Sequence, residues 1–124
     1  MIAGRNAYLG SMVNTASPAR LLVLLYDRLI LDLQRALEAQ TAGDHLSASP
    51  HLLHAQEIIM ELQNSLDIEA WEGGSGLFGI YTWLYRELVR ANVQRDLTVT
   101  QSCIDLVQPL ADAWRGAALA AAEL

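Results

Sequence analysis

The stretch that decides the fold runs from Val13 to Leu37 and reads V-N-T-A-S-P-A-R-L-L-V-L-L-Y-D-R-L-I-L-D-L-Q-R-A-L. Ser17 can accept hydrogen bonds from the free N–H groups of a first helical turn. Pro18 suits the first helical position, because its missing N–H is not needed there and its φ is already helical. The stretch therefore predicts a helix that begins at Ser17 and ends near Gln40, before the break at residues 41–43.

This predicted helix is apolar on more than one side. At about 100° per residue, most of its apolar side chains form one broad stripe. Leu21, Leu24 and Leu31 lie instead on the charged side, which predicts a second surface that something covers. The broad stripe comprises Leu22, Val23, Leu25, Tyr26, Leu29, Ile30, Leu33, Ala36 and Leu37, and the charged side carries Arg20, Asp27, Arg28, Asp32, Arg35 and Glu38.

A second helix has its secure part at residues 51–66, where apolar side chains recur at helical spacing. Its start is open between Asp44, as a cap, and a restart after Pro50. Residues 67–76 hold three glycines and predict a loop.

Two further helices follow the glycine-rich segment. The third is predicted from Leu77 to Val93, with a main stripe and a flanking strip of Phe78, Tyr85 and Val89. Asp96 is the expected cap of the fourth, which runs to the C-terminal end with a kink at Pro109. Four helices without a strand signal predict an all-α fold, an antiparallel up-and-down four-helix bundle over residues 17–124.

Residues 1–16 are predicted to form an N-terminal arm outside the bundle. Its scattered apolar side chains, among them Tyr8 and Val13, are candidate anchors. Two interpretations stay open: an arm that docks on a hydrophobic groove, and a frayed terminus.

Composition narrows the class of protein. The chain has 124 residues, a net charge of −6 and eight arginines but no lysine, with no basic run of the kind that binds nucleic acid. Its single cysteine, Cys103, cannot form an internal disulfide, which favours a reducing compartment. No segment is apolar enough to span a membrane or to serve as a signal peptide, so we expect a cytoplasmic protein without membrane insertion.

No group of residues indicates catalysis. His51, His54 and Glu57 have spacing that could present metal ligands, but the other helices offer no inward carboxylates, which favours solvated surface histidines. Cys103 has no neighbouring base and is interpreted as a core residue. The sequence therefore predicts no catalytic residues, no metal and no cofactor.

The surplus of apolar side chains is the remaining functional signal. A groove for an apolar helical partner would be lined by these residues; the alternative is ordinary burial on two sides and scattered surface side chains. The candidate lining residues are Leu21, Leu24, Leu31, Phe78, Tyr85 and Val89.

Short motifs cover nearly the whole chain in a specific order. They are Tyr8, V-N-T-A-S-P at 13–18, L-L-x-L-L-Y-D at 21–27, A-Q-E-I-I-x-E-L-x-x-S-L-D at 55–67, Y-x-x-L-x-x-x-L-V-x-A-N at 81–92 and A-W at 113–114. In these motifs the sequence resembles the flagellar export chaperone family of FliS-like proteins. It departs from the family at Arg28, where a small residue is usual, and the family varies over residues 67–76, so Trp71 inherits no role.

The resemblance implies a cytoplasmic chaperone that is not an enzyme. Its client would be the C-terminal helical segment of flagellin, which it keeps from polymerising prematurely and helps deliver to the flagellar export gate. The resemblance also implies a possible homodimer and an arm that lies over part of the client site. The alternative is a helix-binding adaptor for a different flagellar regulator or co-chaperone.

Overall fold

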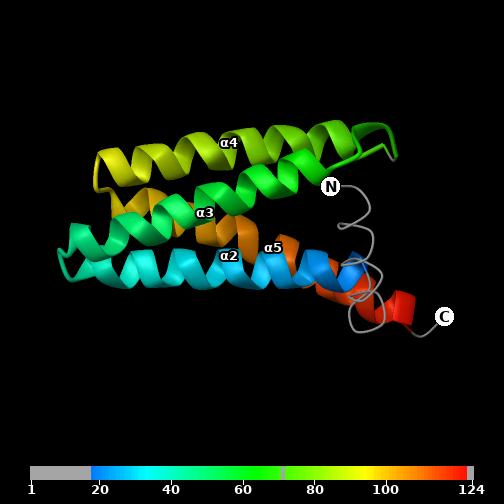
Figure 1. The fold of residues 1–124 in the computed structure, drawn as a ribbon, viewed down its shortest axis with the longest axis horizontal. Coiled ribbons are helices and arrows are strands. Elements are labelled where there is room, and N and C mark those ends of the chain that lie inside the picture. The colour runs from blue at the N-terminus through cyan, green and yellow to red at the C-terminus, as the bar shows by residue number, and fades with distance from the viewer. Residues whose placement is uncertain (1–17, 71, 123–124) are drawn as a thin grey trace, which may run out of the picture.

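The computed structural model describes residues 18–70 and 72–122, and within them the chain is all-α, with no strand (Figure 1). Each of the long helices runs back along its predecessor, and α2 and α4 each pack against both α3 and α5. The predicted antiparallel four-helix bundle is thus confirmed, with α2 and α4 at diagonal corners. The elements are α2 (Pro18–Thr41), α3 (His45–Ser65), the 3₁₀-helix η1 (Ile68–Ala70), α4 (Gly74–Val93) and α5 (Leu97–Ala122).

Helix α2 follows its prediction closely. Its broad stripe supplies buried core residues from Val23 to Ala36, and its last residue lies one position beyond the predicted end. Full burial of a leucine such as Leu29 or Leu33 contributes roughly 1.5–3 kcal/mol. The predicted cap Ser17 and the arm residues Tyr8 and Val13 lie outside the described residues.

One residue of α2 was assigned to the wrong side. Asp32 was predicted on the charged, outward face, but its side chain is fully buried. The carboxylate meets the His54 ring Nδ1 from α3, and its other oxygen lies 3.3 Å from Arg28 Nε. A buried carboxylate is tolerable only when such partners compensate for the lost water, and helical angles alone do not reveal a partner on another helix.

Helix α3 begins at the earlier of its two expected starts. Asp44 is the N-cap, because its carboxylate accepts hydrogen bonds from the Ser47 N–H at 3.1 Å and the Ser47 hydroxyl at 2.6 Å. These two donors hold the pKa of the Asp44 carboxyl below its usual value. The helix then continues through Pro50, near its N-terminal end.

The connection between α3 and α4 is shorter than predicted. The sequence indicated a loop over residues 67–76, but η1 occupies part of it and α4 begins three residues earlier than Leu77, at Gly74. A Cβ atom at Gly74 would lie 2.2 Å from the Ile68 carbonyl oxygen. Gly74 therefore serves a close backbone contact at the helix start.

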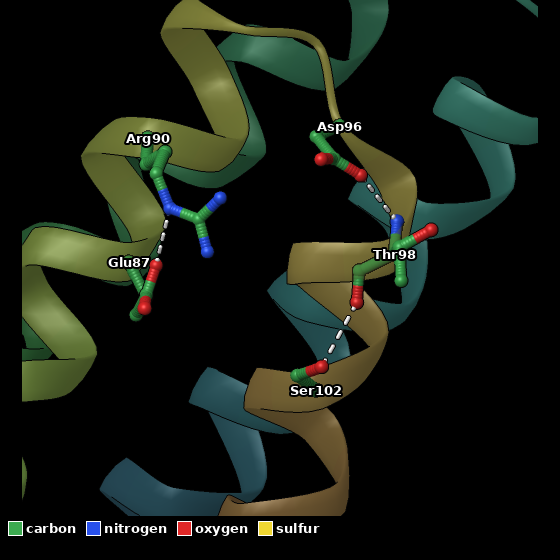
Figure 2. A network of polar contacts seen from close by, with 5 residues as sticks. All are labelled: Glu87, Arg90, Asp96, Thr98 and Ser102. Atoms are coloured by element: carbon green, nitrogen blue, oxygen red, sulfur yellow. Dashed lines mark hydrogen bonds and ion pairs between the residues drawn. The ribbon is translucent and has the colours of Figure 1, made fainter.

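The turn between α4 and α5 has a polar network, drawn in Figure 2. The Asp96 carboxylate accepts a hydrogen bond from the Thr98 N–H at 2.9 Å, which agrees with the predicted cap. Before the turn, within α4 itself, Arg90 Nε lies 2.7 Å from the Glu87 carboxylate (Figure 2). Helix α5 continues through Pro109 as one element.

Candidate partner-binding surfaces

The first candidate surface is a pair of leucines on α2. Leu24 and Leu31 keep 43% and 36% of their surface exposed. They lie three residues before and four residues after Asp27, whose carboxylate pairs with Arg115 of α5. Residues at these spacings share one side of a helix, so both leucines lie along the side of α2 next to α5. Leu21 is partly buried and lies about 60° around the helix from Leu24.

The second candidate surface is on α4. Phe78 and Val89 are 37% and 38% exposed, while Tyr85 is partly buried and packs against the core. Thr82, four residues after Phe78, accepts a 2.8 Å hydrogen bond from the Gln63 side chain of α3. This strip therefore follows the side of α4 that faces α3.

The structure does not bring the two predicted strips into one groove. Leu24 and Leu31 flank α5, whereas Phe78 and Val89 flank α3. Because α2 and α4 are diagonal in the bundle, the two strips lie on opposite sides of it. A partner that contacts both must extend around the molecule.

Helix α3 adds apolar side chains that the sequence analysis did not select. Leu53 and Met60 are 49% and 47% exposed and are seven residues apart, so they share a helix face. In the antiparallel α3/α4 pair, the Gln63–Thr82 hydrogen bond places Met60 level with Tyr85. The spacing of Leu53 and Met60 was the signal that could have identified them. We call the combined surface of Leu53, Met60, Phe78, Tyr85, Val89 and Val93 the α3/α4 face.

A pocket of about 190 Å³ lies at the end of the bundle near the start of α2, and we call it the end pocket. Two residues of its lining, Tyr81 and Trp114, contact the buried Tyr26. The hydroxyls of Tyr26 and Tyr81 form a buried hydrogen bond of 2.7 Å, and the centre of the Trp114 ring lies 6.5 Å from that of Tyr26. Burial raises the pKa of Tyr81, so its hydroxyl stays protonated. The pocket is lined by Leu22, Leu62, Ser65, Leu66, Asp67, Ala70, Leu77, Tyr81 and Trp114.

The candidate metal ligands and the cysteine lie apart from these apolar surfaces, and the structure gives each a different role. His54 binds Asp32 and is not the solvated surface histidine that was expected. In residues 18–70 and 72–122, no group of three or more histidine, cysteine, aspartate or glutamate side chains is arranged to hold a metal ion. Cys103 is buried, as predicted, and burial raises the pKa of its thiol to about 12. None of the described helices is long and apolar enough to cross a membrane.

Comparison with known proteins settles the family. A model of the family described as flagellar protein FliS matches residues 1–121 of this 124-residue chain. The chain belongs to the FliS family. The FliS resemblance first indicated by the motifs is thus confirmed over nearly the full sequence.

Two curated FliS relatives and one solved structure support this assignment. The flagellar secretion chaperone FliS of Bacillus subtilis is 32% identical over 111 residues, which cover 90% of this chain and 83% of the relative. That of Escherichia coli is 30% identical over 107 residues, 85% of this chain and 79% of the relative. A crystal structure of a bacterial flagellar chaperone has the same fold, with a TM-score of 0.75 at 21% identity over 94% of this chain and 95% of that one.

Proposed function

We propose that this FliS chain is a cytoplasmic export chaperone that binds the C-terminal helical segment of flagellin. In this role it keeps flagellin from polymerising prematurely and aids its delivery to the flagellar export gate. The observation that carries the proposal is the presence of exposed apolar rows on two opposite sides of a small bundle. Membership of a family whose curated relatives are named flagellar secretion chaperones supports it.

The geometry suits an extended client better than a single docked helix. A segment that contacts both α2 and the α3/α4 face has to pass around the bundle, which a disordered chain can do. Ordering such a segment costs about 2–5 kcal/mol of the gross interaction energy. Several separate apolar contacts are therefore needed, and the two strips and the end pocket supply them.

The proposed contact residues are those of the two strips, together with two residues of α3 and two of the arm. Leu53 and Met60 join the set because they continue the α4 strip onto α3. Tyr8 and Val13 are proposed as anchors of the arm. The strip residues in the proposal are Leu21, Leu24, Leu31, Phe78, Tyr85 and Val89.

The proposed role is binding without catalysis. Cys103 is the natural candidate for a nucleophile, but its raised pKa keeps it a thiol at neutral pH, and the thiolate is the reactive form. Its full burial also closes it to a substrate. The chemistry that remains is reversible burial of apolar side chains.

Filament growth provides the test of this proposal. Monomeric flagellin from the same organism is added to filament seeds, and light scattering follows elongation with and without an equimolar amount of this chain. Sequestration of the C-terminal segment predicts that elongation is suppressed and resumes when flagellin is in excess. Undiminished elongation at a large excess of the chain would contradict the flagellin assignment and favour a different flagellar partner.

A further inference from the structure

The outer side of α2 carries arginines in line with its exposed leucines. Two leucines and two arginines alternate there at spacings of four, three and four residues, which keeps them on one side of the helix. All four side chains are exposed. We call this set the leucine–arginine row, and it consists of Leu24, Arg28, Leu31 and Arg35. The strip on α2 is therefore not purely apolar, because a guanidinium lies one turn beyond each leucine.

The first arginine of the row is held in place by the buried carboxylate of α2. One Asp32 oxygen lies 3.3 Å from Arg28 Nε, and the other meets the His54 ring of α3. Within residues 18–70 and 72–122, no other carboxylate pairs with the Arg28 guanidinium, so its two terminal nitrogens keep their N–H donors available. Such a pair of donors matches the two oxygens of a carboxylate. Because Asp32 already restricts the arginine, less rotamer freedom is lost when a second carboxylate binds.

The second arginine of the row is unpaired in the part of the chain that the structure describes. Arg35 is exposed, and no carboxylate of that part lies within ion-pair distance of it. It follows Arg28 by seven residues, about 10 Å along the helix at 1.5 Å per residue. The row therefore offers guanidinium donors at two heights, with Leu31 between them.

We propose that the leucine–arginine row binds an acidic amphipathic helix of the client, with client carboxylates on the two arginines and apolar client side chains on the two leucines. This inference rests on the proposed chaperone function and specifies which part of the client suits α2. The two carboxylates are about seven residues apart in the client helix, because both helices rise by the same 1.5 Å per residue. An apolar client residue three or four positions from each carboxylate then meets a leucine.

The acidic side chains near the row limit the strength of these contacts without reversing their sign. Asp27 is paired with Arg115 of α5, so its charge is already compensated. Glu38 is exposed and has no ion pair with a described residue, and it lies three residues beyond Arg35 toward the end of α2. Its charge opposes a carboxylate at Arg35 more than one at Arg28. We therefore expect the arginines to tune client affinity and selectivity, while burial of apolar side chains supplies most of the binding.

Calorimetric titration with the C-terminal segment of flagellin from the same organism tests the row. Arg28→Gln/Arg35→Gln is expected to weaken binding about fivefold at about 0.1 M sodium chloride. The loss shrinks at about 1 M, because the Debye length falls from roughly 10 Å to roughly 3 Å. Arg35→Gln alone keeps the Arg28 contact with Asp32 and is expected to weaken binding about twofold. Its matched control, Arg95→Gln, removes one exposed charge from the turn between α4 and α5 and leaves the affinity unchanged.

A second flagellin segment tests the charges on the client side. In it every Asp and Glu is replaced by Asn or Gln, and the wild-type chain and the double arginine variant are expected to bind it equally. The proposal is overturned if the double variant binds the natural segment as tightly as the wild-type chain does, or if its loss of affinity persists with the amide segment. Absence of binding by the wild-type chain contradicts the proposed chaperone function itself, so the two failures are distinguishable. Circular dichroism checks that the variants stay folded.

Discussion

At Gly74 the start of α4 approaches the preceding 3₁₀-helix so closely that a side chain does not fit. A Cβ atom there would lie 2.2 Å from the Ile68 carbonyl oxygen and 2.8 Å from its carbon. Gly74→Ala forces the backbone to shift, and we expect it to lower the free energy of unfolding by about 2 kcal/mol. Urea unfolding measures this change.

The matched control is Gly79→Ala in the same helix. A Cβ atom at Gly79 would meet open space. Alanine in an exposed helix interior is more favourable than glycine, so this variant gains about 0.5–1 kcal/mol. Equal effects of the two substitutions would show that the contact with Ile68 does not constrain the connection.

The buried tyrosine pair couples α2 and α4 across the core. Tyr26 contacts the Tyr81 hydroxyl, and a hydrogen bond with the Trp114 side chain also acts on it. Tyr26→Phe therefore removes a hydrogen-bond partner from both the Tyr81 hydroxyl and the Trp114 side chain. Tyr81→Phe removes a partner only from the Tyr26 hydroxyl. We expect losses of about 2 and 1 kcal/mol in unfolding free energy, because buried groups without partners are costly.

A double-mutant cycle isolates this coupling. The variant with both tyrosines replaced by phenylalanine should lose little more stability than Tyr26→Phe alone, since Tyr81→Phe then breaks no further bond. Strict additivity of the two single losses, measured by chemical denaturation, would argue against a coupled pair.

At the scale of the helices, the Asp32 carboxylate of α2 binds His54 of α3 and so connects the two helices. His54→Ala removes its partner from α3 and leaves the buried carboxylate with Arg28 alone. Because the His54 side chain is 42% exposed, solvent screens part of the pair, and we expect a loss of about 1–2 kcal/mol. His51→Ala, one turn earlier on α3, is the control and should change the unfolding free energy by less than about 0.5 kcal/mol.

The strip on α2 has a prediction of its own for client binding. Leu24→Glu/Leu31→Glu places charges where the proposed client buries apolar side chains, so affinity for the flagellin segment should fall at least tenfold. Both leucines are exposed, so helicity by circular dichroism should be unchanged. Thr41→Glu/Ala42→Glu adds the same charge at exposed positions at least ten residues beyond Leu31 and should bind normally. Unfolding of the leucine variant would show that those side chains belong to the core.

The sequence predicted those features of the molecule that depend on local pattern. Helical periodicity and the Asp96 cap gave the four helices, because both act within a few residues. The buried Asp32 was missed because its partner His54 comes from another helix. Gly74 was assigned to a loop because its close contact with Ile68 depends on how the chain folds back.

The same limit applies to the candidate site. Angles around single helices identified Leu24, Leu31, Phe78 and Val89, and all four are exposed. Angles around a single helix do not specify which helices are neighbours. The placement of the two strips on opposite sides of the bundle could therefore not be predicted. The end pocket was missed for the same reason, since its lining comes from all four long helices and their connections.

At the scale of the whole molecule, the proposal is that the bundle presents separate apolar surfaces to a client that folds as it binds. The measurement that tests this most directly is calorimetric titration of the wild-type chain with the C-terminal segment of flagellin from the same organism, with circular dichroism of the mixture. We predict one-to-one binding with a negative heat-capacity change and a gain in helicity. Absence of binding at high micromolar concentrations would contradict the flagellin assignment.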